Sequence, residues 1–287
     1  MPHESKPGII PLRPLAVGEL LDGVFSMIRR HAGLVLGLSA VVASLQAVLS
    51  VVIPGLLGSF SLPLDPNADP AVTEVQSQAF QLASQLVGIV VTAILGALLA
   101  GAIVVIVGEA VLGRPVSARS VWAKVRPRIW ALLWCSFVVG VVPILGLILL
   151  IAPGVWLWAA WSLATPALVL EGVGPVMAIR RSYRLVRRAW WRTFFIRVLA
   201  WLIASVVSGV IAAPFAIVGL LLSDGSFDNG IPTTFLALYA LGTALAAAIT
   251  LPFASGVQAL LYIDRRIRAE ALDVKLAEAV AQDPAAL

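Results

Sequence analysis

Residues 129–170 decide the fold, and they read IWALLWCSFVVGVVPILGLILLIAPGVWLWAAWSLATPALVL. This run of 42 residues contains no Asp, Glu, Lys or Arg. A helix that crosses a bilayer needs roughly 20 apolar residues, so the run is long enough for two crossings. Ala152-Pro153-Gly154 supplies a turn between them, because Pro interrupts a helix and Gly accepts unusual backbone angles. The run therefore predicts helices near 130–151 and 155–171, and a re-entrant hairpin over 130–170 is the alternative.

Four further runs without charged residues lie at 32–64, 75–108, 198–223 and 229–263. The chain is 60% apolar and 12% charged, with a mean hydropathy of +1.00. A soluble domain is about 45–50% apolar and about 25% charged, so a water-soluble protein is excluded. The single cysteine, Cys135, excludes a disulfide scaffold. We therefore expect an all-α integral membrane protein with about six transmembrane helices, near 33–57, 80–108, 130–151, 155–171, 198–222 and 232–262.

Basic residues are confined to four segments of the chain. Segments 1–31, 109–128, 171–197 and 264–287 contain four, five, seven and four Lys and Arg residues, which together are all 20 in the chain. The connections near 58–80 and 223–231 contain none. Because cytoplasmic loops collect Lys and Arg, this pattern predicts a multi-pass protein of a bacterial inner membrane with both termini in the cytoplasm. It also explains the pI of about 10.0 without a nucleic-acid partner.

A short pattern recurs before the first, third and fifth predicted spans. Pro14, Pro115 and Pro175 open the three stretches. At an offset of 61 residues, Trp122, Val125, Arg126 and Trp130 match Tyr183, Val186, Arg187 and Trp191. We therefore predict three membrane hairpins, each preceded by a cytoplasmic amphipathic helix. They form one bundle domain at 15–263, between a cytoplasmic N-terminal segment at 1–14 and a cytoplasmic C-terminal tail at 264–287.

The amphipathic helix before the fifth span is the clearest candidate binding surface. Its apolar side carries Val176, Ile179, Tyr183, Val186 and Trp190, and its basic side carries Arg180, Arg181, Arg184, Arg187 and Arg188. Such a helix can lie in the membrane interface, with its apolar stripe at the acyl boundary and its arginines at anionic headgroups. Together with Arg126, Arg29 and Arg30 from the other two stretches, these arginines are the predicted sites for lipid headgroups or a partner. The alternative is a nonspecific anchor that only sets topology.

Small and acidic residues in the spans give two further predictions. Small residues recur every four positions in the second span, at Ser84, Gly88, Thr92, Gly96 and Ala100. This spacing favours close helix packing within the bundle, with packing between copies as the alternative.

Glu109 and Glu171 each close an even-numbered span near basic residues, so we expect both to form interfacial ion pairs.

The chemistry of an enzyme is missing from the sequence. No span interior holds Asp, Glu, Lys, Arg or His, which also argues against an ion-coupled transporter. The two histidines, His3 and His31, have no metal-ligand companion at a usable spacing. Asp65, Asn67 and Asp69 imitate the start of a calcium loop, but its sixth and twelfth positions do not match. We expect no metal, no cofactor and no catalysis, and we expect the embedded Gln46, Gln85 and similar residues to form interhelical hydrogen bonds.

Several motifs resemble one family of bacterial membrane proteins. They are Ile10-Pro-Leu-Arg-Pro-Leu-Ala-Val-Gly-Glu-Leu-Leu-Asp-Gly23, Val111-Leu-Gly-Arg-Pro-Val116, Ala152-Pro-Gly-Val-Trp156, Ala164-Thr-Pro-Ala-Leu-Val-Leu-Glu171 and Ser182-Tyr-Arg-Leu-Val-Arg187. Over about residues 10–265 the chain resembles the actinobacterial glycerophosphoryl diester phosphodiesterase membrane-domain family. The family takes its name from members that fuse this bundle to a catalytic barrel with histidines and acidic metal ligands. Nothing in this sequence matches that barrel, so the resemblance carries over no catalytic residue. It implies an inner-membrane protein that acts beside separately encoded partners.

Two functions remain in consideration from the sequence. The first is a noncatalytic scaffold or accessory subunit of a membrane assembly, which the basic inner face and the missing chemistry favour. The second is the binding or transport of lipid or a small apolar solute in a groove between hairpins. A lateral opening lined by Arg187, Arg188 and embedded Gln residues would favour the second function, and a filled core would favour the first.

Overall fold

The computed structural model describes residues 13–59, 70–223 and 232–270, and all regular secondary structure in these ranges is helical. The elements are α1 (Val17–Arg30), α2 (Ala32–Ser59), α3 (Pro70–Val111), α4 (Ala118–Val125), η1 (Arg126–Arg128), α5 (Ile129–Leu149), α6 (Ile151–Ala160), α7 (Ala164–Glu171), α8 (Pro175–Arg187), α9 (Trp190–Leu222) and α10 (Thr233–Glu270). In the described part of the chain, six helical stretches are long and apolar enough to cross a membrane. The prediction of an all-α membrane protein with about six spans is therefore confirmed.

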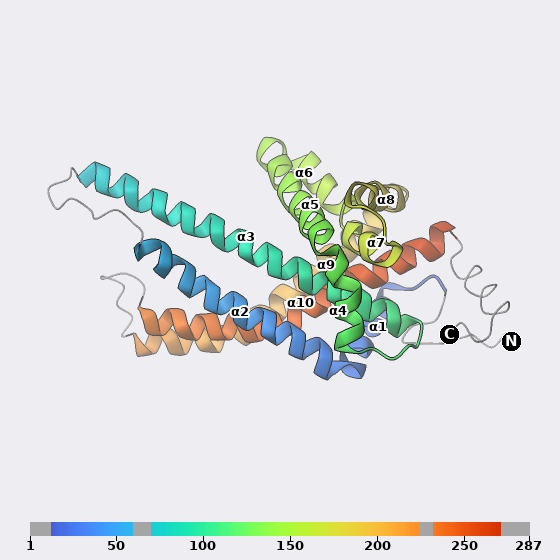
Figure 1. Ribbon diagram of the computed structural model, residues 1–287, viewed down its shortest axis with the longest axis horizontal. Helices are drawn as coiled ribbons and strands as arrows, with labels where there is room; N and C mark the ends of the chain where they lie inside the picture. The colour runs from blue at the N-terminus through green and yellow to red at the C-terminus, as the bar shows by residue number, and fades with distance from the viewer. Residues whose placement is uncertain (1–12, 60–69, 224–231, 271–287) are drawn as a thin grey trace.

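The helices follow the predicted threefold order. The short helices α1, α4 and α8 precede the pairs α2–α3, α5–α6 and α9–α10, and the two helices of each pair contact one another. In Figure 1, α2, α3, α9 and α10 run along the length of the molecule, while α5 and α6 form a hairpin that diverges from α3. The three short helices gather at one end with the last turns of α10, and we name this the basic end.

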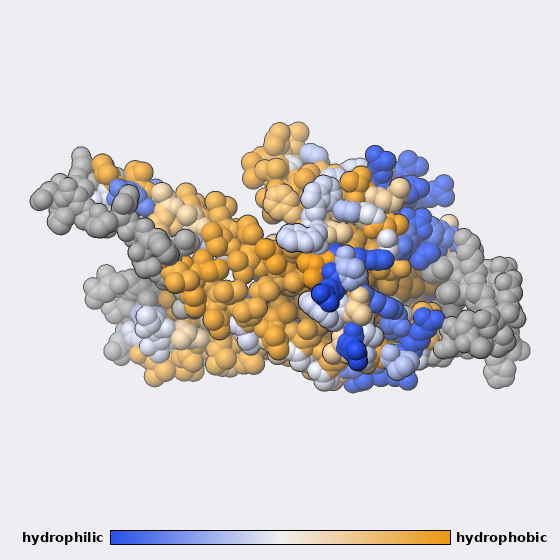
Figure 2. Space-filling model, in the orientation of Figure 1, coloured by the Kyte–Doolittle hydropathy of each residue, from blue (hydrophilic) through white to orange (hydrophobic). Residues whose placement is uncertain are grey.

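The surface divides along the same axis. Hydrophobic residues cover the long helices, and hydrophilic residues gather around α1, α4 and α8 (Figure 2). The first helix shows why: Leu20, Val24 and Met27 fall at helical spacing and are buried, whereas Arg29 and Arg30 in its last turn are exposed. Each short helix therefore covers the bundle with its apolar face and carries charge on its outer face.

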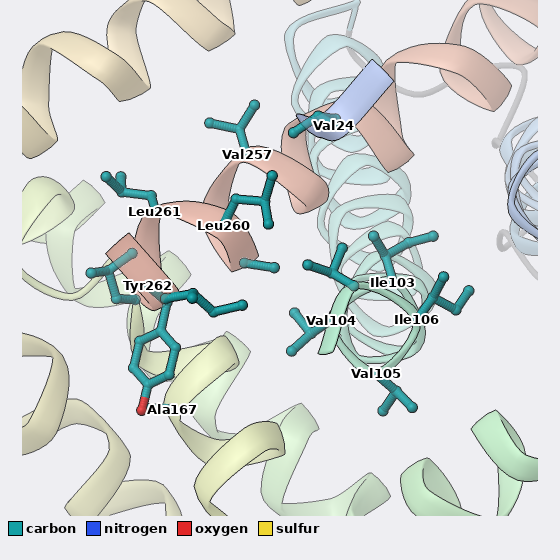
Figure 3. Packing of buried hydrophobic residues seen from close by; sticks show 14 of the residues in the cluster. Val24, Ile103, Val104, Val105, Ile106, Ala167, Val257, Leu260, Leu261 and Tyr262 are labelled. Atoms are coloured by element: carbon teal, nitrogen blue, oxygen red, sulfur yellow. The ribbon is translucent and has the colours of Figure 1, made fainter. Parts of the chain in front are cut away.

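The buried core lies in the half of the bundle next to the basic end. It joins α1, α3, α7 and α10 through residues such as Val24, Ile103, Ile106, Ala167 and Leu260 (Figure 3). Towards the other end, α2, α3 and α9 expose most of their apolar side chains. Because lipid solvates such side chains as well as protein does, this half can stay loosely packed in a membrane.

Several helices extend beyond the spans expected from hydropathy. The helix predicted near 80–108 begins at Pro70, and the one predicted near 198–222 begins at Trp190. The last helix continues through Ile263 to Glu270, into the segment expected to be the tail. Hydropathy detects only the apolar part of a helix. The helix can continue into polar or charged turns at its ends, and hydropathy does not detect those turns.

The turn within 129–170 lies earlier than predicted. It is formed by the extended residue Leu150, and Pro153 sits in the first turn of α6, where a missing backbone N–H costs little. The glycine after it permits close approach, because a Cβ atom on Gly154 would lie 2.3 Å from the backbone nitrogen of Leu147. Gly154 therefore serves tight packing of α5 on α6, and the Pro-Gly pair does not form the turn itself.

Close packing at the small residues of α3 is found elsewhere than predicted. A Cβ atom on Gly88 or Gly96 would meet nothing within 4 Å, whereas one on Gly101 would lie 2.8 Å from Leu132. The prediction that the whole stripe packs within the bundle is therefore wrong at Gly88 and Gly96. Other residues of the same stretch of α3 do have neighbours, since Ala97 and Leu99 are buried and the Thr92 carbonyl accepts a hydrogen bond from Gln46 of α2.

Candidate functional site: the basic end

Side chains of α8 and α9 stabilise a break in the fourth apolar stretch. Between α6 and α7, the Ser182 hydroxyl accepts a hydrogen bond from the Leu163 N–H at 3.0 Å and donates to the Ala160 carbonyl at 2.7 Å. The guanidinium of Arg197 lies 3.8 Å from the centre of the Trp158 ring and donates to the Trp158 carbonyl. Backbone groups left unpaired in a membrane are costly, so these contacts permit a broken helix there.

The end of α7 is held by a second arginine. Arg128 of η1 donates through Nη1 to the carbonyls of Leu168 (2.9 Å) and Val169 (3.0 Å), which belong to the last turns of α7. A cation is stabilising at a helix C-terminus, where carbonyls lack helical partners. Gly172 ends the helix with a φ of 72°, and a Cβ atom there would lie 2.5 Å from Arg128 Nη2. This position therefore favours glycine for its backbone angle, and a larger residue would also displace the end of the Arg128 side chain.

Five side chains form what we name the Glu171 cluster: Glu171, Arg181, Tyr262, Arg266 and Glu270. Arg181 Nε donates to both carboxylate oxygens of Glu171 at 3.0 Å, and its Nη2 donates to Glu270 at 2.6 Å. Arg266 Nε lies 3.3 Å from both glutamates, and the Tyr262 hydroxyl donates to Glu171. Burial alone would lower the pKa of Arg181, but the bonds to Glu171 and Glu270 outweigh it and raise the pKa above its ordinary value. The cluster joins α7, α8 and α10.

A second group, which we name the Asp264 cluster, fastens the segment before α1 to α10. Asp264 is fully buried, and its Oδ1 accepts hydrogen bonds from the Leu15 N–H and from Arg268 Nε, both at 2.9 Å. Arg268 and Arg192 also donate to the Leu15 carbonyl, at 2.8 and 2.7 Å. Arg192 lies 3.4 Å from Asp264 Oδ2. One carboxylate thus connects α9, α10 and the N-terminal segment.

Each of the three hairpins ends near an acidic residue that binds a short helix or the segment leading into one. Glu109 near the end of α3 pairs with Lys124 of α4, and Glu171 at the end of α7 pairs with Arg181 of α8. The predicted ion pairs of Glu109 and Glu171 are therefore confirmed. At the end of α10, Asp264 holds the segment that leads into α1. Each short helix is therefore bound to the end of a hairpin, and the third hairpin binds the first short helix.

The structure divides the predicted arginine sites into two groups. Arg181 lies inside the Glu171 cluster, although the sequence placed it with the other arginines. Its position on the flank of α8 brings it within reach of two glutamates. The remaining seven are exposed and lie on three different elements. They are Arg180, Arg184 and Arg187 on α8 and Arg188 directly after it, Arg126 on η1, and Arg29 and Arg30 at the end of α1.

The apolar face of α8 is directed towards the protein, in contrast to the expected contact with acyl chains. Ala178, Leu185 and Val186 are buried, and the Tyr183 ring packs against Trp156 with ring centres 5.6 Å apart. Val176, which was expected in the same stripe, is 52% exposed. The helix is therefore docked on the bundle, and the four exposed arginines lie on its outward side.

The site has the character of a charged surface. Among the described residues, no three His, Cys, Asp or Glu side chains come close enough to hold a metal ion. Asp65 and Asp69, from the sequence that imitates a calcium loop, lie outside the described residues. No protein-family model, curated protein or solved structure matches this chain.

Sequence reasoning did not assign Tyr262 to this site, and it placed Asp264, Arg266 and Glu270 only in a helical tail of mixed charge on the binding surface, without their partners. A local signal for them exists: Asp264–Arg268 and Arg266–Glu270 are acid–base pairs four residues apart, the spacing of neighbours on a helix surface. That spacing indicates a helix through the segment that was expected to be the tail.

Proposed function

We propose that this protein is a noncatalytic scaffold or accessory subunit of an assembly in the bacterial inner membrane. Its basic end and both termini would face the cytoplasm, as the distribution of Lys and Arg indicates. The observation that carries the proposal is the fixed array of Arg180, Arg184, Arg187 and Arg188. None of the four forms an ion pair with another described residue, while Arg181 and Ser182 on the inner side hold α8 in place.

A fixed array of charges suits binding. The backbone of α8 is already docked on the bundle before binding, which reduces the entropy that a partner must overcome. Each basic residue near an anionic surface contributes about 1 kcal/mol, so four on one helix face favour contact with anionic lipid headgroups. The same four arginines would also attract acidic segments of a partner protein. The resemblance to the membrane-domain family, with its separately encoded partners, supports an assembly role.

Transport of lipid, the alternative function, has less support. The structure contains a lateral groove lined by Gln46 and Gln85, but neither Arg187 nor Arg188 lines it. A transporter for anionic lipid would need cations at the mouth of its groove. The half of the bundle next to the basic end is instead filled by a continuous apolar core, as a scaffold would have.

The proposal is tested by removing the array without disturbing the fold. Arg180, Arg184, Arg187 and Arg188 are replaced together by Gln, and Arg181 is kept. Proteins crosslinked to the chain in native membranes are then identified and their stoichiometry is measured, together with anionic lipid retained through purification. We expect a stoichiometric partner of the wild-type protein to be lost from this variant.

The matched control replaces Arg29, Arg30 and Arg126 with Gln, which removes positive charge from other elements of the same end. A partner that persists in the control but is lost from the α8 variant supports a specific scaffold. A partner lost equally from both variants, or retained by both, contradicts the role of the α8 array. If anionic lipid is the only molecule whose retention changes, the scaffold proposal fails and a lipid anchor replaces it.

A further inference from the structure

A lateral groove runs between α2, α3 and α5, away from the basic end. Its volume is about 770 Å³. Residues from three helix faces line it: Gln46, Leu49 and Ile53 on α2, Gln85, Gly88 and Thr92 on α3, and Ser136, Gly140 and Ile144 on α5. The groove exists because the α5–α6 hairpin diverges from α3, as Figure 1 shows.

The groove lies at the depth of the lipid hydrocarbon. At 1.5 Å per residue, Gln85 is about 36 Å along α3 from Glu109, and Ser136 is about 10 Å along α5 from Ile129. A hydrocarbon core of about 30 Å would therefore contain most of the groove, with Gln85 near the interface away from the basic end. The tip of the hairpin is apolar too, since Ile148, Leu149, Leu150 and Ile151 are 67–79% exposed. Apart from Gln46, Gln85, Thr92 and Ser136, the residues that line the groove are apolar or glycine.

An empty groove of this kind would be unfavourable, because its lining atoms would lack contacts on one side. The volume falls within the range of about 300–1,000 Å³ found for pockets of small ligands. At this depth the bilayer itself supplies the apolar occupant, because hydrocarbon chains surround the three helices.

Polar groups in the groove favour an occupant with its own polar group. The Gln46 amide donates to the Thr92 carbonyl at 3.3 Å. No hydrogen bond joins the Gln85 amide or the Ser136 hydroxyl to another residue in the ranges that the structure describes. A polar group without a partner is costly in hydrocarbon, where Ser136 lies, and at the interface the Gln85 amide N–H can donate to an ester carbonyl. Gln85 stands where the esters of a lipid in the leaflet away from the basic end would lie.

We propose that this groove binds one acyl chain of a phospholipid from the leaflet away from the basic end, with an ester carbonyl of the lipid at Gln85. The chain would extend along α5 past Gly140 towards Ser136. It would occupy the space that Gly88 and Gly140 leave open, and it would connect the α5–α6 hairpin to α2 and α3.

The test uses the full chain in nanodiscs that contain phosphatidylglycerol with a photoreactive diazirine on one acyl chain. Labelling of residues 133–144 is measured relative to labelling of the exposed α9 face at Trp201 and Val206. Gly88→Phe and Gly140→Phe fill the groove, and neither position has an atom within 4 Å of a new Cβ. Gly37→Phe is the matched control, because Gly37 is an equally open glycine of α2 that does not line the groove.

We expect either groove substitution to lower the relative labelling at least about tenfold, and Gly37→Phe to leave it unchanged. Gln85→Leu should lower labelling by the phospholipid but not by a diazirine-labelled alkane, which has no ester. Equal labelling of wild-type and groove-filled proteins overturns the proposal. So does disulfide dimerisation of a Gly88→Cys variant in the nanodisc, because a second copy would then occupy the groove.

Discussion

Replacing Asp264 with Ala should detach the N-terminal segment from the bundle. The change removes the acceptor for the Leu15 N–H and the counterion of Arg192 and Arg268, at a position that is fully buried. Removing one partner of a buried ion pair costs about 3–5 kcal/mol. Because Arg192 and Arg268 keep 29% and 31% of their side chains exposed, water takes over part of their pairing. We therefore expect the lower end of that range, about 3 kcal/mol, in the free energy of unfolding.

Two measurements check this prediction. Unfolding by a denaturing detergent gives the free energy, and hydrogen exchange reports the Leu15 amide directly. Asp264→Asn is the matched control: it keeps an acceptor for Leu15 and loses the charge, so Leu15 should stay protected and the destabilisation should be smaller by about 1 kcal/mol or more. Trypsin should cut after Arg29 and Arg30 faster in the Ala variant alone. A loss below about 1 kcal/mol for Asp264→Ala, with Leu15 still protected, would refute the assigned role.

Three other predictions follow from single contacts. Gly154→Leu should separate α6 from α5 and lower the unfolding midpoint, because its Cβ would lie 2.3 Å from the Leu147 nitrogen, whereas Gly140→Ala in open space should not. Ser182→Ala should cost about 1–3 kcal/mol, since it leaves the Leu163 N–H unpaired at the α6–α7 break; detergent unfolding measures this, and full stability of the Ala variant would contradict it. Burial and then Arg30 hold the pKa of His31 below its ordinary value. The stability gained from neutral His31 is therefore present above its unfolded-state pKa and lost as pH falls through the folded one. His31→Gln should flatten the pH dependence of the unfolding midpoint below about pH 6.5, and an unchanged slope would contradict this.

The number and order of the helices were predictable because their signals are local. Each span is a continuous apolar run, and each short helix shows its apolar spacing within about four turns. The ion pair of Glu171 with Arg181 was also within reach, because the two residues are separated by only ten positions. The buried face of a helix and ion pairs between residues close in the chain can be predicted because both depend mainly on the local sequence.

Contacts between distant segments could not be predicted in this way. Leu15 and Asp264 are separated by 249 residues, and nothing near either one indicates the other. The place of Arg181 on the inner side of α8 depends on Glu270, which lies 89 residues further along the chain. The lateral groove depends on the angle at which α5 leaves α3, and hydropathy does not encode that angle.

The bond between Leu15 and Asp264 also constrains how the protein is made. The part of α10 that binds α1 is complete only after residue 264 has left the ribosome. At about 5–20 residues per second, synthesis of the intervening 249 residues takes on the order of 10–50 s. During that interval Leu20, Val24 and Met27 have no protein partner from α10, so the nascent helix must rest on the membrane surface. Within the described ranges, α1 therefore docks onto α10 only after all the helices between them have been made.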